Sequence, residues 1–229
     1  MLIKTAVPQL LQGCQLIALA YRVFEGDLPD NALPKNSRLL SIKPDGPTSD
    51  LELFGILTET ETTLRITLRG TDSFDDWVTD SRISLVKALF GQVTAGVDDL
   101  AKQLLKQLLT FNLHANKQLI IEGHSLGAAV ATHLAYLIYL CHREVSAVYA
   151  FASPKFANAQ YASAYEAQLG YRTLRIVNAA DVVPNVPLDI PGLLYLQHVC
   201  PDQTFVDDNG DIRYRHSIDT YQNNIRNWL

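Results

Sequence analysis

The residues best suited to chemistry lie in one short stretch, Ile120 to Ala129, which contains the pattern Gly-x-Ser-x-Gly. Gly123, Ser125 and Gly127 follow an apolar run typical of a strand and precede a longer run typical of a helix. A serine on a sharp strand-to-helix turn presents its hydroxyl for attack, and small neighbours remove Cβ clashes at such a turn. The pattern predicts a nucleophilic Ser125; the alternative is a glycine-rich turn without chemistry.

A serine hydroxyl becomes a good nucleophile only when a base removes its proton, and that base needs an orienting carboxylate. Of the six histidines, His124 adjoins Ser125 but is expected to point away from it on the turn. His198 lies inside an apolar segment, whereas His216 lies where the last helical segment begins and where a side chain can reach over a sheet. We therefore predict His216 as the base and keep His198 as the alternative.

The candidate acid is Asp181, which closely follows an apolar segment that ends at Asn178. Carboxylates beyond the C-terminal ends of parallel strands face the edge of the sheet where ligands bind. The alternative for Asp181 is a loop or capping aspartate without a catalytic part. The other acids that compete for the role are Asp189, Asp202, Asp207 and Asp208.

Length and composition suit one globular α/β domain that spans residues 1–229, with 48% hydrophobic and 19% charged residues. A net charge of −5 argues against nucleic acid as a partner. The three cysteines have no metal-ligand spacing, and the acidic turn at 207–211 is too short for an EF-hand loop, so we expect neither metal nor cofactor. Without a signal-peptide or transmembrane pattern we expect a cytoplasmic protein; the alternative is a lipoprotein box at Cys14.

Hydrophobic periodicity predicts helices that alternate with strands around Ser125, and hence a mostly parallel central sheet with helices on its faces. One strand, residues 64–68, alternates apolar and polar side chains and is expected to have one solvated face. The predicted helices are 7–24, 95–111, 128–141, 157–169 and a C-terminal segment; the other strands are 51–57, 145–151, 174–178, 194–199, 203–206 and 212–214, the last two joined in a hairpin by Asn209-Gly210.

Together these motifs resemble the class 3 lipases, the fungal lipase-like branch of the α/β-hydrolases. The resemblance covers most of the chain, from the first helix to His216, and departs from the family at Thr94, Val97 and Ala128. The segments that carry it are Leu68-Arg69-Gly70-Thr71, Trp77 to Asp80, residues 92–97, the elbow at 121–129, residues 177–187, Tyr195 to Val199, and His216 with Tyr221.

The resemblance implies an α/β-hydrolase fold and a triad of Ser125, Asp181 and His216, with His198 outside the triad. The expected oxyanion hole consists of the backbone N–H groups of Thr71 and Leu126. The implied activity is carboxylic ester hydrolysis, as in a lipase that cleaves acylglycerol esters through an acyl-enzyme. The alternatives are an esterase, thioesterase or phospholipase of the same fold, or a non-catalytic lipid-binding relative.

One more segment bears on the expected substrate, which is a lipid or another acyl ester. Phe74, Trp77 and Val78 share one face of a predicted short helix beside the Gly70-Thr71 loop. Such a helix would act as a lid that opens on transient contact with a lipid interface. The alternative is a fixed helix that packs Trp77 into the core; the oligomeric state is not readable from the sequence.

Overall fold

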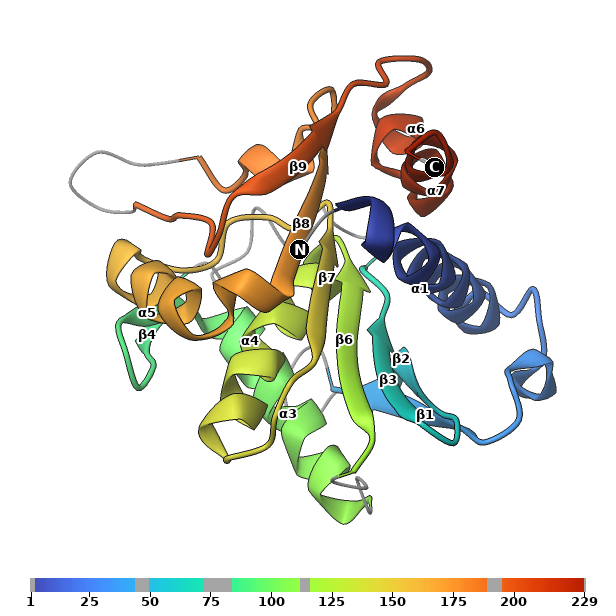
Figure 1. Ribbon diagram of the computed structural model, residues 1–229, viewed down its shortest axis with the longest axis horizontal. Helices are drawn as coiled ribbons and strands as arrows, with labels where there is room; N and C mark the ends of the chain where they lie inside the picture. Colours follow the sequence, from blue (N-terminus) through green and yellow to red (C-terminus); the bar gives the residue numbers. More distant parts are fainter. Residues whose placement is uncertain (1–2, 44–49, 72–83, 112–115, 189–194, 229) are drawn as a thin grey trace.

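The computed structural model describes residues 3–43, 50–71, 84–111, 116–188 and 195–228. Within them, one sheet of seven strands runs through the molecule in the order β1-β2-β3-β6-β7-β8-β9 (Figure 1). The first three strands pair antiparallel, and all pairs from β3 to β9 are parallel. The strands are β1 (Ser37–Ile42), β2 (Glu52–Glu59), β3 (Thr63–Leu68), β6 (Gln118–His124), β7 (Ala147–Phe151), β8 (Thr173–Asn178) and β9 (Asp202–Phe205).

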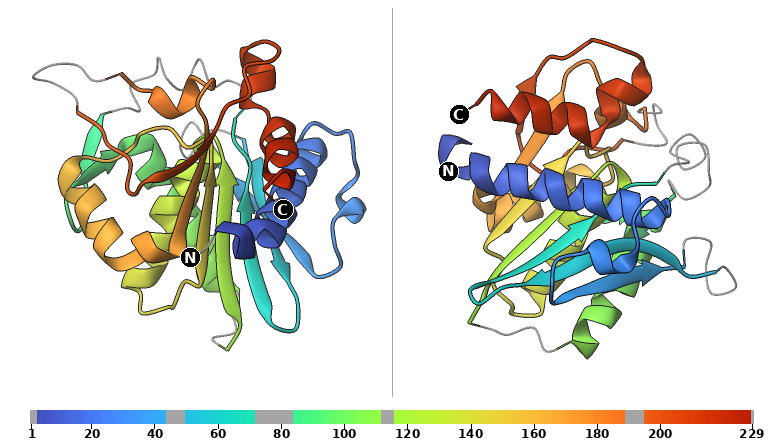
Figure 2. Two further views of the ribbon diagram at one scale, coloured as in Figure 1. Left: turned by 45° about the horizontal axis from the view of Figure 1, so that its top comes forward. Right: turned by 90° about the vertical axis from the view of Figure 1, so that its right-hand side faces the viewer.

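Helices cover both faces of this sheet, which confirms the predicted α/β architecture. On one face α1 (Ile3–Phe24) lies beside α7 (Ile218–Arg226), and their apolar side chains form a core with β6, β7 and β8 (Figure 2). On the other face a larger core joins the sheet to α3 (Ala95–Thr110), α4 (Leu126–Leu140) and α5 (Ala159–Leu169). None of the described helices is both long enough and apolar enough to cross a membrane.

The remaining elements are short. β4 (Leu85–Lys87) and β5 (Gln92–Thr94) form an antiparallel pair outside the main sheet, and α6 (Ile212–His216) precedes α7. In the described part of the chain, 3₁₀ turns occur at Asp30–Ala32, Gly170–Arg172 and Val183–Asn185. The predicted helices and most of the predicted strands correspond to observed elements. For most of these elements the predicted and observed ends differ by one or two residues.

Two of the strand predictions in the last third of the chain are wrong. Residues 195–199 form no strand beyond a single bridge at Gln197, and residues 212–214 lie in α6. The Asp211 side chain accepts a hydrogen bond of 2.9 Å from the backbone N–H of Tyr214, so it caps the start of that helix. Because the cap starts a helix directly after Gly210, no hairpin forms and β9 pairs with β8 instead.

The expectation of a solvated face on β3 is also wrong, because α1 covers that face. The Arg65 side chain is 3% exposed, and its guanidinium lies 2.5 Å from the fully buried carboxylate of Glu122 on β6. Thr67 donates a 2.7 Å hydrogen bond to the same carboxylate, and Gln9 of α1 accepts from Arg65. Burial raises the pKa of Glu122, while the positive charge of Arg65 opposes that rise. Polar residues on β3 thus mark a buried ion pair.

We predict that Arg65→Met lowers the free energy of unfolding by about 3–5 kcal/mol, because it leaves the Glu122 carboxylate buried without a counter-charge. The control is Arg172→Met, since Arg172 pairs with Glu144, whose side chain is 71% exposed, and such pairs contribute about 0–1 kcal/mol. Chemical denaturation measures both variants. If both variants lowered the free energy of unfolding equally, the buried ion pair would contribute no more to stability than the exposed one.

Candidate active site

Ser125 occupies the turn between β6 and α4 that the sequence predicts. Its backbone has φ 57° and ψ −131°, a conformation that residues other than glycine rarely adopt. The turn requires glycine on both sides, because a Cβ at Gly123 would lie 2.3 Å from the carbonyl oxygen of Gly127, and one at Gly127 would lie 2.1 Å from that of Arg69. The strained turn and its glycines are the features of a nucleophile elbow.

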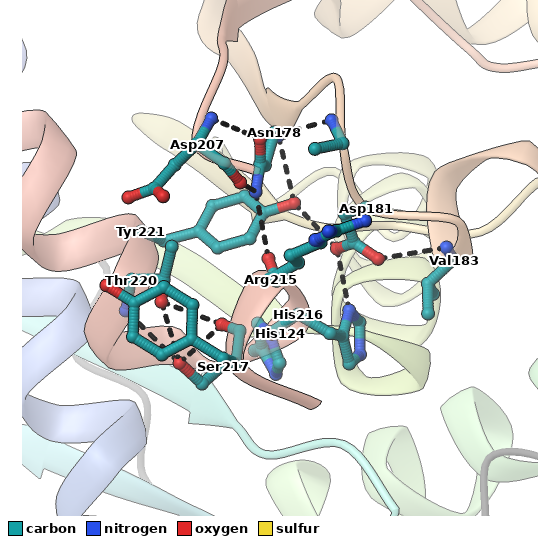
Figure 3. Close-up of polar contacts among 12 residues, drawn as sticks. His124, Asn178, Asp181, Val183, Asp207, Arg215, His216, Ser217, Thr220 and Tyr221 are labelled. Atoms are coloured by element: carbon teal, nitrogen blue, oxygen red, sulfur yellow. Dashed lines mark hydrogen bonds and ion pairs between the residues drawn. The ribbon is translucent and has the colours of Figure 1, made fainter. Parts of the chain in front are cut away.

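The predicted base and acid meet directly. His216 Nδ1 lies 2.7 Å from Asp181 Oδ2, although the two residues come from α6 and from the loop after β8 (Figure 3). Asp181 is 2% exposed, and its other oxygen accepts a 3.0 Å hydrogen bond from the backbone N–H of Val183. A carboxylate accepts only, so Nδ1 of His216 carries a proton and Nε2 is the nitrogen that can accept one.

Asn178 and Tyr221 hold this pair in place. The Asn178 side-chain amide donates hydrogen bonds to the carbonyl oxygens of Asp207 (2.8 Å) and Arg215 (3.1 Å), which ties the end of β8 to the residue before His216 (Figure 3). The Tyr221 hydroxyl donates to Asp181 Oδ2 at 2.9 Å. Burial and the negative charge of Asp181 raise the pKa of Tyr221, so the phenol keeps the proton that it donates.

The segment predicted to supply one oxyanion donor lies against the elbow. A Cβ at Gly70 would lie 2.7 Å from the Cβ of Ser125, so the Gly70-Thr71 segment passes directly beside the serine. Leu126 is the first residue of α4, and backbone N–H groups of a first helical turn have no acceptor within the helix. The Ser125 hydroxyl is itself buried and has no hydrogen-bond partner among the described residues.

The sequence assigns no part to His124, whereas the structure packs its ring on His216 with centroids 4.6 Å apart. His124 Nε2 lies 2.7 Å from the carbonyl oxygen of His216, and Nδ1 lies 2.9 Å from the hydroxyl of Tyr21 on α1. A carbonyl only accepts, so Nε2 carries the proton and Nδ1 accepts from Tyr21. The Tyr21 oxygen in turn accepts a 2.7 Å hydrogen bond from the backbone N–H of Gly70. One chain of hydrogen bonds thus connects α1, the Gly70-Thr71 segment, the elbow and the predicted base.

Burial lowers the pKa of His124 well below its ordinary value, and the neighbouring His216 lowers it further. His124 therefore stays neutral at the pH where most histidines begin to protonate. A neutral ring beside His216 places no second positive charge against the imidazolium that forms when His216 accepts a proton. The network thus fixes the position of the predicted base, His216, without opposing the positive charge that it would carry.

The structure places the other candidates outside this arrangement or leaves them undescribed. His198 Nε2 lies 2.8 Å from the carbonyl oxygen of Pro184, and burial, with the charge of Arg175, lowers the pKa of His198 to about 4. Asp202 and Asp208 are exposed, and the Asp207 carboxylate accepts from Asn209 and Asn224. Four residues of the sequence predictions lie outside the described residues: Phe74, Trp77, Val78 and Asp189.

We predict that the His124 ring stays neutral, with the proton on Nε2, when the pH falls from about 8 to the ordinary histidine value of 6.5, because burial and His216 lower the pKa of His124 well below 6.5. Two-bond ¹H–¹⁵N correlation spectra of the histidine rings measure the tautomer directly. In Tyr21→Phe the hydrogen bond to Nδ1 is lost, but the carbonyl oxygen of His216 still accepts from Nε2, so the same tautomer should persist. A titration midpoint for His124 at or above 6.5 in the unsubstituted protein would contradict the assignment.

Comparison with known proteins shows which family the chain belongs to. The model of the family described as Lipase (class 3) matches residues 65–190, which include Ser125 and Asp181, while His216 lies beyond the matched range. Among solved structures, the triacylglyceride lipase of Rhizomucor miehei superposes with a TM-score of 0.69 at 20% identity, covering 89% of this chain and 82% of that one. At that identity the likeness shows the fold alone.

Two curated relatives match the central part of the chain. The secreted mono- and diacylglycerol lipase A of Penicillium cyclopium is 36% identical over 112 residues, which are 49% of this chain and 34% of that protein. The phospholipase A1-II 1 of Oryza sativa subsp. indica is 40% identical over 87 residues, which are 36% of this chain and 22% of the relative. The matched part thus spans at most 34% of these relatives. The family model matches more than half of the chain, and the chain belongs to the class 3 lipase family.

Proposed function

We propose that this protein is a serine-dependent carboxylic ester hydrolase, a lipase that cleaves acylglycerol esters through an acyl-enzyme. The observation that carries the proposal is the hydrogen bond between His216 and Asp181, next to the strained elbow of Ser125, where the neighbouring His124 donates to the backbone of His216. The names of the relatives agree with ester substrates, since they describe a mono- and diacylglycerol lipase, a phospholipase A1 and a triacylglycerol lipase.

In the proposed reaction, Ser125 Oγ attacks the ester carbonyl carbon while His216 Nε2 takes the hydroxyl proton. Asp181 stabilises the imidazolium that results, and the N–H groups of Leu126 and Thr71 donate to the oxyanion, where one such donor contributes about 3 kcal/mol. The bond between the carbonyl carbon and the alkoxy oxygen then breaks, and His216 gives its proton to the departing alcohol. Water attacks the acyl-enzyme with His216 again as base, which releases the fatty acid and restores Ser125.

We also propose contact with a lipid interface. Its support comes from the turn between β4 and β5, where Leu89 is 71% and Phe90 is 44% exposed. Val86 and Ala88 in the same hairpin pack against the larger core, so the hairpin is anchored while its tip presents apolar side chains. Interfacial segments insert such side chains into the boundary between headgroups and acyl chains.

We predict that Ser125→Ala lowers kcat for a soluble acyl ester by at least about 10⁴-fold and abolishes labelling by a fluorophosphonate, because both reactions need the serine oxygen. Peptide mapping of the labelled protein should find the probe on Ser125. The matched control is Ser146→Ala, because Ser146 is exposed just before β7, at the opposite edge of the sheet. Hydrolysis or labelling that persists in Ser125→Ala would contradict the proposed nucleophile, whereas the lack of both in the unsubstituted protein would favour a non-catalytic lipid-binding protein.

A further inference from the structure

A cavity of about 730 Å³ opens beside His216, between α1 and the segment that joins α6 to α7. Thr71 lines it together with His216, so it adjoins both the predicted base and a predicted oxyanion donor. In ester hydrolysis the base returns its proton to the departing alcohol, which must therefore lie on the imidazole side of the scissile bond. The position of the cavity suits the alcohol part of a substrate rather than its acyl chain.

Among the described residues, four charged side chains line this cavity. Arg22 lies in the last turn of α1 and Glu25 directly follows that helix, while Arg213 lies in α6 and Asp219 in the first turn of α7. Neither Arg22 nor Arg213 forms an ion pair with any carboxylate among the described residues. An acyl chain placed here would remove two guanidinium groups from water without compensation, which is unfavourable.

The charges match one kind of alcohol group. Guanidinium groups bind phosphate oxygens through paired hydrogen bonds, which are stronger than hydrogen bonds between neutral groups. Asp219 places a carboxylate in the same lining as the two arginines, so the lining suits a phosphodiester that also carries a cation better than it suits a bare phosphate. An uncharged glyceride would offer no charged partner to Arg22, Arg213 or Asp219.

We propose that this cavity binds the zwitterionic phosphodiester headgroup of an acylglycerol, with Arg22 and Arg213 on the phosphate and Asp219 toward the cationic end. This inference rests on the proposed ester hydrolysis and names its substrate class. The chemistry is unchanged: water cleaves the acyl ester, and the glycerol phosphodiester leaves with the proton from His216. The two arginines are therefore specificity residues and take no part in bond breaking.

The test compares two substrates with the same acyl chain in the same neutral detergent micelles, a lysophosphatidylcholine and a monoacylglycerol. The measured quantity is the ratio of kcat/KM for the phospholipid to kcat/KM for the neutral ester. The double variant Arg22→Gln/Arg213→Gln should lower this ratio at least about tenfold, the loss expected for hydrogen bonds to a charged group. Arg172→Gln, at the opposite edge of the sheet, should leave the ratio unchanged.

Thermal unfolding of each variant establishes that it folds, and the ratio is independent of the amount of active protein. A ratio unchanged in the double variant, or equal proportional losses on both substrates, would overturn the headgroup assignment while ester hydrolysis stands. A protein that hydrolyses neither substrate and takes no fluorophosphonate on Ser125 would overturn the proposed function and this inference with it.

Discussion

The hydrogen bond between the Asp181 carboxylate and His216 Nδ1 is the interaction on which the site depends. It joins the C-terminal end of β8 to the short helix α6, and a buried carboxylate with two further donors, Val183 and Tyr221, has little freedom to move. Because His216 Nδ1 donates to Asp181, the orientation of the imidazole ring is fixed and Nε2 points away from the carboxylate. The parallel sheet contributes by bringing the ends of β6 and β8 to one edge, with β7 between them.

The second constraint is the helix that covers this side of the sheet. α1 buries Arg65 and Glu122 below the elbow, and near its C-terminal end it supplies Tyr21, which holds both Gly70 and His124. The same helix therefore stabilises the sheet and positions the segments that carry the predicted oxyanion donor and base. It also forms one wall of the charged cavity, so the proposed headgroup site and the predicted catalytic residues share one structural support.

Much of the site is predictable from sequence because its chemistry demands particular residue types in a particular order. Ser125 is identified by the glycines that its turn requires, and Asp181 by its place after a strand. Tyr21 and His124 are not predictable in this way, since they are 103 residues apart and meet only through tertiary packing. The predictions of a solvated face on β3 and of a hairpin at Gly210 are wrong, also because of tertiary packing and local capping. Periodicity describes a segment alone, whereas the cover of α1 and the cap at Asp211 decide its surroundings.

The central claim is that Ser125, His216 and Asp181 converge on one reacting carbon with the oxyanion donors opposite. A crystal structure of the protein inactivated by an alkyl phosphonate tests it most directly. The account predicts phosphorus bonded to Ser125 Oγ, one phosphoryl oxygen about 2.7–3.1 Å from the N–H groups of both Leu126 and Thr71, and His216 still bonded to Asp181. An adduct on another residue, or a phosphoryl oxygen that faces solvent away from Leu126 and Thr71, would contradict it.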